Sequence, residues 1–339
     1  MKFSPEILMI DVEAEIRSIA SAIQSLVRET HRKRGAVVAV SGGIDSATCA
    51  ALCAKALGKD RVLALFLPER DSSSMSLELA EQLAENLDLQ FITEPVGEIL
   101  QAAGCYARQD EAIRMTLPEY ETGWKFKITL PSLFSGDRLN VPRLTVQTNS
   151  GETLTRRMPA SAYLQLVAAT NFKQRVRTMI AYYHADRLNY AVCGTPNRLE
   201  YDQGFFVKGG DGLADFKPIA HLYKTQVYAI AAALDVPREI VERTPTTETY
   251  SLTQTQEEFY FALPYEKLDL CLYGLNHNVP AAEVARAINQ PAENVERVYR
   301  DIETKRRTTL PLHLHSLMKE PVPEIESLKS SLARSGSRG

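Results

Sequence analysis

The sequence predicts an α/β fold in which a doubly wound parallel sheet carries a β-rich insertion and a helical C-terminal part. Three observations lead to this prediction. An apolar run over 36–40 passes directly into a Gly-Gly turn and then a helical pattern. Two more apolar runs, 62–67 and 89–93, follow with a helical pattern between them. The pattern then changes to a β-rich one between 104 and 159, and helical patterns dominate from 225 onward.

The remaining elements of the parallel unit follow from apolar spacing. Isoleucines recur at helical spacing over 6–30, with acidic residues near the start, so an amphipathic helix is expected there. Helices are also expected over 47–57, 77–87 and 163–186. A strand over 190–193 then returns the chain to the sheet. Such sheets bind their ligands at the carboxyl ends of the strands.

Residues 104–159 interrupt the parallel pattern and are expected to form an insertion. Residues 124–128 predict a strand, and 144–155 predict a hairpin around a turn. Two roles stay open: the insertion packs over or beside the mouth of the site, or it is a surface hairpin, which loops tolerate.

Four segments of helical periodicity predict a helical C-terminal part: 227–234, 265–273, 281–288 and 292–306. The main domain is expected over 1–310. Proline, serine and glycine beyond 321 indicate a loosely held tail over 311–339.

Composition excludes several classes of protein. The 339 residues are 45% hydrophobic and 24% charged with a formal net charge of -3, as in a globular protein without a nucleic-acid partner. The five cysteines are scattered without a Cys-x-x-Cys spacing, which indicates a reducing compartment and no zinc site. We found no signal-peptide core and no run of transmembrane length, so no membrane partner and a cytoplasmic location are expected.

The segment Ser41–Ser46, with the sequence Ser-Gly-Gly-Ile-Asp-Ser, is the most informative motif. Its glycines permit close approach of a ligand, and its amides and the positive end of the following helix point at one anion. Asp45 among such amides favours a role in holding Mg²⁺ on a bound phosphate. The pattern is neither the Gly-x-x-x-x-Gly-Lys-Ser/Thr loop nor the Gly-x-Gly-x-x-Gly fingerprint. A plain strand-turn-helix corner is the alternative.

A second group of polar residues follows the strand that ends at Cys193. Glu200 is expected at the same sheet edge as Asp45, and two carboxylates suit one Mg²⁺ whose other ligands are phosphate oxygens. Lys208 and Lys224 are cations suited to a triphosphate. Each of these charged residues, taken alone, is also typical of a protein surface, but their convergence at one sheet edge favours a nucleotide site.

These motifs resemble the NAD synthetase family of the ATP pyrophosphatase superfamily, whose fold is Rossmann-like and adenine nucleotide α-hydrolase-like. The matching segments are Ser41–Ser46, Asn171–Met179, Gly194-Thr195 with Glu200, Phe205–Lys208, Gly210–Gly212 with Asp215, Lys224, and Pro245-Thr246. The resemblance covers most of 6–310. In the family's C-terminal His-Lys pair only Lys305 is matched, and the insertion is longer than the short family form.

The resemblance implies ATP-dependent amidation of the nicotinate carboxylate of deamido-NAD by ammonia, through an acyl-adenylate, giving NAD, AMP and pyrophosphate. It implies ATP contacts by Ser41, Gly42, Gly43, Ile44, Asp45, Ser46, Thr195, Lys224 and Thr246, and Mg²⁺ ligation by Asp45 and Glu200. It implies deamido-NAD contacts by Arg175, Lys208, Asp215 and Lys305. Asp45, Lys208 and Lys224 are the expected catalytic residues. A homodimer is also implied, with ammonia either free or supplied by a separate glutaminase.

Two other functions compete with this interpretation. Another ATP pyrophosphatase, such as a tRNA thiolase or a guanylate-forming amidase, shares the loop, but thiolation favours a basic face and paired cysteines that this sequence lacks. A non-catalytic nucleotide sensor needs the phosphate-binding amides but neither the two carboxylates nor the two lysines.

Overall fold

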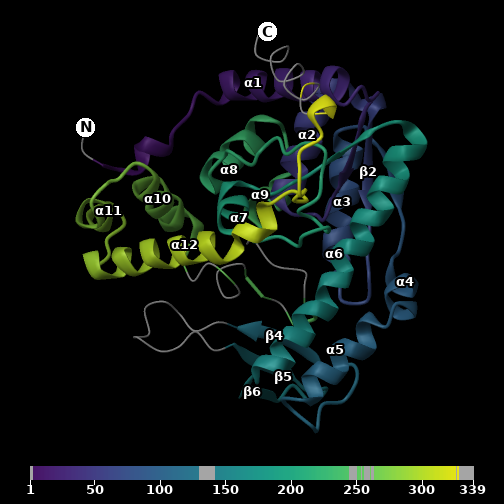
Figure 1. The fold of residues 1–339 in the computed structure, drawn as a ribbon, viewed down its shortest axis with the longest axis vertical. Coiled ribbons are helices and arrows are strands. Elements are labelled where there is room, and N and C mark those ends of the chain that lie inside the picture. The colour runs from purple at the N-terminus through teal and green to yellow at the C-terminus, as the bar shows by residue number, and fades with distance from the viewer. Residues whose placement is uncertain are drawn as a thin grey trace.

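Four parallel strands form the central sheet of the computed structural model, which describes residues 3–129, 142–243, 250–252, 254–255, 260, 263–325 and 327. The strands are β1 (Ala36–Ala39), β2 (Val62–Phe66), β3 (Gln90–Thr93) and β7 (Ala191–Cys193). Their order is β3-β2-β1-β7, so the chain changes direction across the sheet at β1 (Figure 1). This confirms the parallel sheet and puts a ligand-binding crevice between β1 and β7.

Helices cover both faces of this sheet, which confirms the doubly wound arrangement. One face carries α1 (Val12–Gln24), α2 (Ile44–Leu57), α3 (Ser74–Asn86) and α8 (Lys224–Ala233); the other carries α4 (Gly97–Ala102) and α6 (Ala160–Leu188). The strand residues alternate accordingly: Ala36 and Val38 pack into the first core, and Val37 packs into the second. A π-helical turn, Ser25–Thr30, continues α1. Short 3-10 helices stand at Pro5–Leu8 and Lys59–Arg61.

The C-terminal part is helical, as predicted. Its elements are α7 (Arg198–Gln203), α9 (Arg238–Glu242), α10 (Tyr265–Asn276), α11 (Ala281–Ala287) and α12 (Ala292–His313). The last three share a core of their own, in which α12 buries Val295, Val298 and Ile302. That helix continues to His313, past the position at which the tail was expected to begin. In the part of the chain that the structure describes, no helix combines the length and apolar character needed to cross a membrane.

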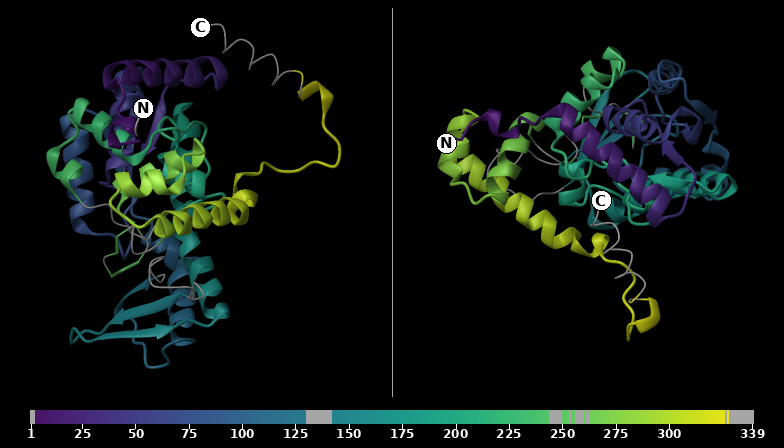
Figure 2. Two further views of the ribbon diagram at one scale, coloured as in Figure 1. Left: turned by 90° about the vertical axis from the view of Figure 1, so that its left-hand side faces the viewer. Right: turned by 90° about the horizontal axis from the view of Figure 1, so that it is seen from above.

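The insertion forms a three-stranded antiparallel sheet at the end of α6 that lies away from the central sheet (Figures 1 and 2). Its elements are α5 (Cys105–Arg114), β4 (Lys125–Thr129), β5 (Arg143–Gln147) and β6 (Thr153–Arg157). The strand and the hairpin are confirmed, whereas α5 was not predicted. One sheet face, with Phe126, Ile128, Leu144 and Val146, packs on α5 and the first turns of α6. The insertion therefore has its own core while sharing α6 with the main unit.

Candidate active site

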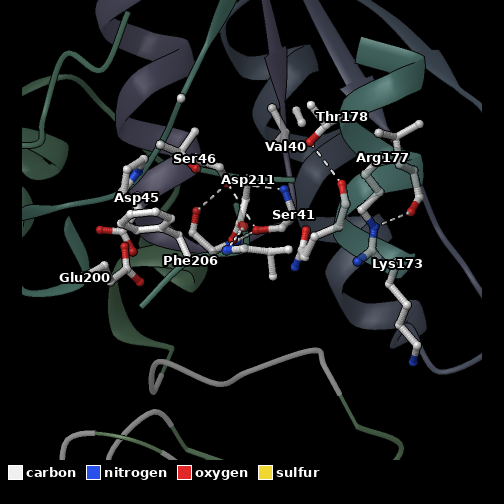
Figure 3. A pocket seen from close by; sticks show the side chains of 18 of the residues that line it. Val40, Ser41, Asp45, Ser46, Lys173, Arg177, Thr178, Glu200, Phe206 and Asp211 are labelled. Atoms are coloured by element: carbon white, nitrogen blue, oxygen red, sulfur yellow. Dashed lines mark hydrogen bonds between the residues drawn. The ribbon is translucent and has the colours of Figure 1, made fainter. Parts of the chain in front are cut away.

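A cavity of about 500 Å³ opens at the carboxyl ends of β1, β2 and β7. Its walls come from the turn after β1, the loop after β2, one side of α6 and the segment after β7 (Figure 3). Ile128 and Tyr163, from the insertion and the start of α6, also line it. The volume is within the usual range for small-molecule sites, so this cavity is the candidate active site.

The turn after β1 has the geometry that the motif predicts. Gly42 has φ +73°, and a Cβ built on it would lie 2.4 Å from the carbonyl oxygen of Ser76. Ser46 Oγ donates to the carbonyl oxygen of Gly43 at 2.9 Å and accepts from the amide of Ser41 at 3.2 Å. No side-chain cap is present at the N-terminus of α2 among the described residues. The first amides of that helix are therefore available to an anion.

We expect Gly42→Ala to damage this turn far more than Gly43→Ala. The added methyl at Gly42 meets a backbone carbonyl and demands a left-handed conformation, which together cost about 2 kcal/mol of stability. At Gly43, the nearest atom is Ser41 Oγ at 3.4 Å and φ is -95°. Thermal melts and ATP affinity of both variants measure the difference. Equal losses in the two variants would contradict the geometry described here.

Asp45 and Lys224 form an ion pair beside the turn, in which the lysine is buried and the aspartate is partly buried. Asn197 Nδ2 also donates to Asp45 Oδ1 at 3.1 Å. The backbone amide of Asn197 donates to Glu200 Oε2 at 3.1 Å, as part of the capping box that begins α7. Figure 3 shows the carboxylates of Asp45 and Glu200 side by side at the cavity. The sequence prediction that these two carboxylates and Lys224 converge is therefore matched by the geometry.

The electrostatics of this group favour an additional cation. Burial, reinforced by the charge of Asp45, raises the pKa of Glu200 to about 8. Burial acts to lower the pKa of Lys224, but the charges of Asp45 and Glu200 outweigh it and leave that pKa above its ordinary value. Asp269 fixes the start of α8 by accepting from the amides of Lys224 and Thr225 at 3.2 and 2.8 Å. One lysine thus faces two carboxylates.

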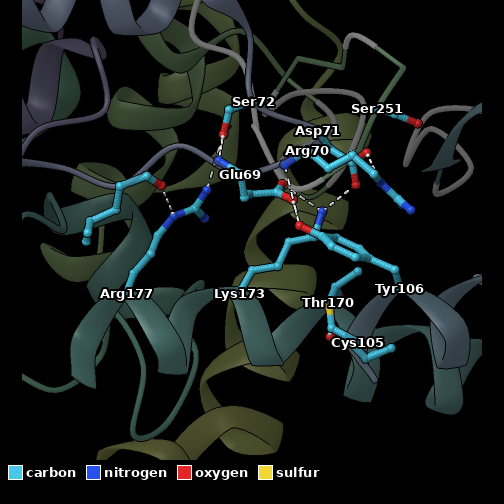
Figure 4. Close-up of polar contacts among 12 residues, drawn as sticks. Glu69, Arg70, Asp71, Ser72, Cys105, Tyr106, Thr170, Lys173, Arg177 and Ser251 are labelled. Atoms are coloured by element: carbon cyan, nitrogen blue, oxygen red, sulfur yellow. Dashed lines mark hydrogen bonds and ion pairs between the residues drawn. The ribbon is translucent and has the colours of Figure 1, made fainter. Parts of the chain in front are cut away.

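A second polar group on the cavity wall was not predicted from the sequence. Lys173 of α6 is 1% exposed, and its amine lies 3.0 Å from Glu69 Oε1 and 2.6 Å from Asp71 Oδ2 (Figure 4). The hydroxyl of Tyr106 donates to Glu69 Oε2 at 2.8 Å. These contacts fix the loop after β2 against α6. Arg70 Nε also lies 3.2 Å from Asp71 Oδ1, so two cations compensate the two carboxylates.

Two arginines also line the cavity wall: Arg177 falls within the matching segment Asn171–Met179 but was given no role, and Arg243 was missed. Arg177 Nε donates to the carbonyl oxygen of Leu67 at 3.1 Å, and Arg243 donates to Ser76 Oγ at 3.0 Å. The signal that points to this wall is the run of polar residues, Glu69 to Ser73, which begins three residues after the last residue of the strand, Phe66. Ligands bind at the carboxyl ends of parallel strands, and this applies to the end of β2 as well as to the ends of β1 and β7.

The other residues predicted to bind ATP fall into three groups. Thr195, Ile44 and the rest of the turn line the cavity, with the exception of Gly42, which packs on α3 behind it. Thr246 lies outside the described residues. Its role stays a prediction.

Four residues predicted to bind deamido-NAD are not among the described residues that line the cavity: Arg175, Lys208, Asp215 and Lys305. Arg175 Nε donates to the carbonyl oxygen of Lys208 at 3.3 Å, and Lys208 Nζ donates to that of Pro311 at 2.9 Å. The carboxylate of Asp215 accepts from the amide of Val192 at 2.7 Å. Lys305 Nζ donates to the carbonyl oxygen of Tyr260 at 2.6 Å. Their binding roles stay predictions.

Comparisons with known proteins show the family to which the chain is similar. The family model described as NAD synthase matches residues 15–117 and 140–309. The part of the insertion outside the match is therefore 118–139. The chain is 53% identical over 319 residues to an NH(3)-dependent NAD(+) synthetase of Rhizobium rhizogenes, covering 94% of this chain and 96% of that protein. It is 35% identical to the protein of the same name from Thermotoga maritima, over 87% of this chain and 97% of that protein.

Solved structures share the fold. An NMN synthetase from Francisella tularensis has a TM-score of 0.63 at 21% identity, covering 92% of this chain and 100% of that one. An NH3-dependent NAD synthetase from Campylobacter jejuni has a TM-score of 0.59 at 23% identity, with the same coverage. These two similarities concern the fold alone. The family match over most of the chain, together with the 53% identity, shows that the chain belongs to the NAD synthase family.

Proposed function

We propose that this protein is an ammonia-dependent NAD synthetase, which uses ATP to amidate the nicotinate carboxylate of deamido-NAD and releases AMP and pyrophosphate. The observation that carries the proposal is the meeting of the glycine turn, Asp45, Glu200 and Lys224 at one cavity in a chain of this family. The leaving group of a free carboxylate would be oxide, which ammonia cannot displace. The carboxylate must therefore be activated first. Adenylation supplies that activation.

The residues of this chain are suited to the first step. The carboxylate oxygen of deamido-NAD attacks the α-phosphorus of ATP, and the bond to the β-phosphate bridging oxygen breaks. The amides of Ser41–Ser46 and the N-terminus of α2 receive the leaving pyrophosphate. Lys224, held by Asp45, offsets the negative charge that grows on the leaving oxygens. Ammonia then attacks the acyl carbon, and AMP leaves.

Asp45 and Glu200 fit a role as ligands of Mg²⁺. Within the described part of the chain, no group of three or more His, Cys, Asp and Glu side chains forms a metal site. A pair of carboxylates is nevertheless what an ion needs when phosphate oxygens and water complete its octahedron. Burial and the charge of Asp45 raise the pKa of Glu200, and the charge of Lys224 offsets this rise only in part. When bound, Mg²⁺ would neutralise phosphate charge and increase the electrophilicity of the α-phosphorus.

The reaction itself is tested with purified protein, ATP, Mg²⁺, ammonium and deamido-NAD. We expect NAD, AMP and pyrophosphate in equal amounts. Adenosine diphosphate in place of AMP, or AMP formed equally well without deamido-NAD, would contradict the proposal. Replacing ammonium with glutamine decides whether the protein has a glutaminase activity, and we expect no NAD in that arm.

Glu200→Gln is expected to raise the Mg²⁺ concentration for half-maximal activity about tenfold or more, because it removes one charged oxygen ligand. The change keeps the shape of the side chain and the capping box of α7. Mg²⁺ titrations at saturating ATP measure it. Glu303→Gln, at an exposed position of α12, is the matched control. An unchanged Mg²⁺ requirement would remove Glu200 from the metal site.

Arg177→Ala is expected to weaken substrate binding more than Arg175→Ala. Arg177 lines the cavity, whereas Arg175 is exposed and contacts the carbonyl of Lys208. The lost guanidinium contact is expected to raise the Kd of one substrate about tenfold. Separate titrations with ATP and deamido-NAD measure both variants. If only Arg175→Ala weakens the binding of deamido-NAD, the family-based role of Arg175 holds, and our expectation that Arg177 matters more is wrong.

Further properties belong to this proposal as predictions. We propose a homodimer in the cytoplasm that takes ammonia either free or from a separate glutaminase, with no nucleic-acid or membrane partner. Sedimentation of the purified protein tests the oligomeric state, and a monomer that turns over at the full rate would contradict the dimer.

A further inference from the structure

The C-terminal half of α12 contacts the segment that carries Glu200. This segment, residues 198–208, comprises α7 and the loop after it, and we call it the α7 segment. Four of its side chains line the cavity, together with Gly204: Glu200, Phe205, Phe206 and Val207. Figure 1 shows the end of α12 beside α7. The contacting residues of α12 do not themselves line the cavity, so α12 acts on the site only through the α7 segment.

The first contact is a double hydrogen bond. Arg306 donates from Nε and Nη2 to the two carboxylate oxygens of Asp202, at 2.7 and 2.6 Å. The same Nη2 donates to Asn276 Oδ1 of α10 at 2.6 Å. A bidentate arginine-carboxylate pair restricts orientation as well as distance. It therefore fixes the rotation of α7 relative to α12.

The second contact is a close backbone approach. Gly204 ends α7 in a left-handed conformation with φ +71°. A Cβ at this position would lie 2.3 Å from Cβ of Thr309. The backbone at the end of α7 thus lies directly against the Thr309 side chain of α12, which leaves no room for a side chain at position 204.

The third contact is aromatic and reaches the cavity wall. The rings of Tyr201 and Phe206 stack at 6.0 Å and 21°, and the His313 ring packs edge-on against both, at 4.9 and 5.1 Å. Lys208 Nζ donates to the carbonyl oxygen of Pro311 at 2.9 Å. The imidazole therefore supports Phe206 from the side that packs on α12.

We propose that the last two turns of α12 position the α7 segment for catalysis, with His313 as the positioning residue for Phe206. Arg306 and the Gly204 junction hold the axis of α7, and His313 holds the aromatic pair at its end. Glu200 is thereby kept opposite Asp45. The reaction that this positioning affects depends on the proposed function. The positioning of the α7 segment by α12 does not depend on it.

The test compares His313→Ala with His313→Phe, which keeps a ring, and with His315→Ala, a control at an exposed position two residues on. Hydrogen exchange of the amides at 204–212 is measured in the full-length protein without ligands. We expect about fivefold faster exchange in His313→Ala and wild-type exchange in the other two variants. We also expect kcat/KM to fall about tenfold in His313→Ala, to recover in His313→Phe, and Tm to stay within about 2 °C of wild type.

Unchanged exchange at 204–212 in His313→Ala, or the same acceleration in His315→Ala, would overturn the proposal. A lower Tm with unchanged kcat/KM would also overturn it, because it would assign the contacts to stability alone. The exchange measurement needs no substrate. If the protein failed to make NAD, the exchange result would therefore still decide whether α12 positions the α7 segment.

Discussion

Asp45→Asn is expected to lower kcat roughly 10³-fold, equivalent to about 4 kcal/mol of transition-state stabilisation. The change is nearly isosteric but removes the charge that holds Lys224 at the cavity and, in the proposed function, one oxygen ligand of Mg²⁺. Stability is expected to fall by about 2 kcal/mol. This loss is smaller than for most broken buried pairs because Glu200 still faces the lysine and raises its pKa.

Turnover and thermal unfolding are measured together on the same preparation of Asp45→Asn. Asp60→Asn, at an exposed position of the turn before β2, controls for a general loss of carboxylate charge. Turnover within threefold of wild type would show that the charge of Asp45 is not needed for adenylation. A fall in turnover explained by unfolding would appear as a transition below the assay temperature.

The sequence predicted the parts of the fold whose pattern is local. The strand over 36–39 is a continuous apolar run, as expected for a strand covered on both faces, and Gly42 and Gly43 mark the turn that follows. Glu200 was predicted at the site because its strand ends at the same sheet edge. The two carboxylates lie 155 residues apart in sequence, so topology rather than proximity in the chain identified them.

Other features could not be read from local patterns. The helix over 105–114 has few apolar residues, and its buried positions are explained by packing on α6 and on the β4–β5–β6 sheet. Lys173 is indistinguishable in sequence from a surface lysine, because its burial depends on two carboxylates that come from another loop. The α12 contacts at Gly204 and His313 join segments about a hundred residues apart. Each of these three features depends on contacts between segments that are distant in the sequence.

Lys224→Met is the second variant with a large expected effect. Lys224 is 2% exposed, and its amine is the cation that faces both Asp45 and Glu200. Without this amine, the carboxylates of Asp45 and Glu200 lie close together and lose the positive charge that compensates them, so the free energy of unfolding is expected to fall by about 3 kcal/mol. Turnover is expected to fall at least about 10²-fold, because the charge on the leaving pyrophosphate loses a fixed cation.

Calorimetry with and without Mg²⁺ separates the structural and catalytic parts of this effect. If Asp45 and Glu200 form the metal site, Mg²⁺ supplies the missing positive charge and raises the Tm of Lys224→Met more than that of wild type. Lys55→Met, at an exposed position of α2, controls for loss of a lysine elsewhere. Equal shifts of Tm in all three proteins would place the metal away from this pair of carboxylates, and the proposed ligands would then be wrong even if the enzyme makes NAD.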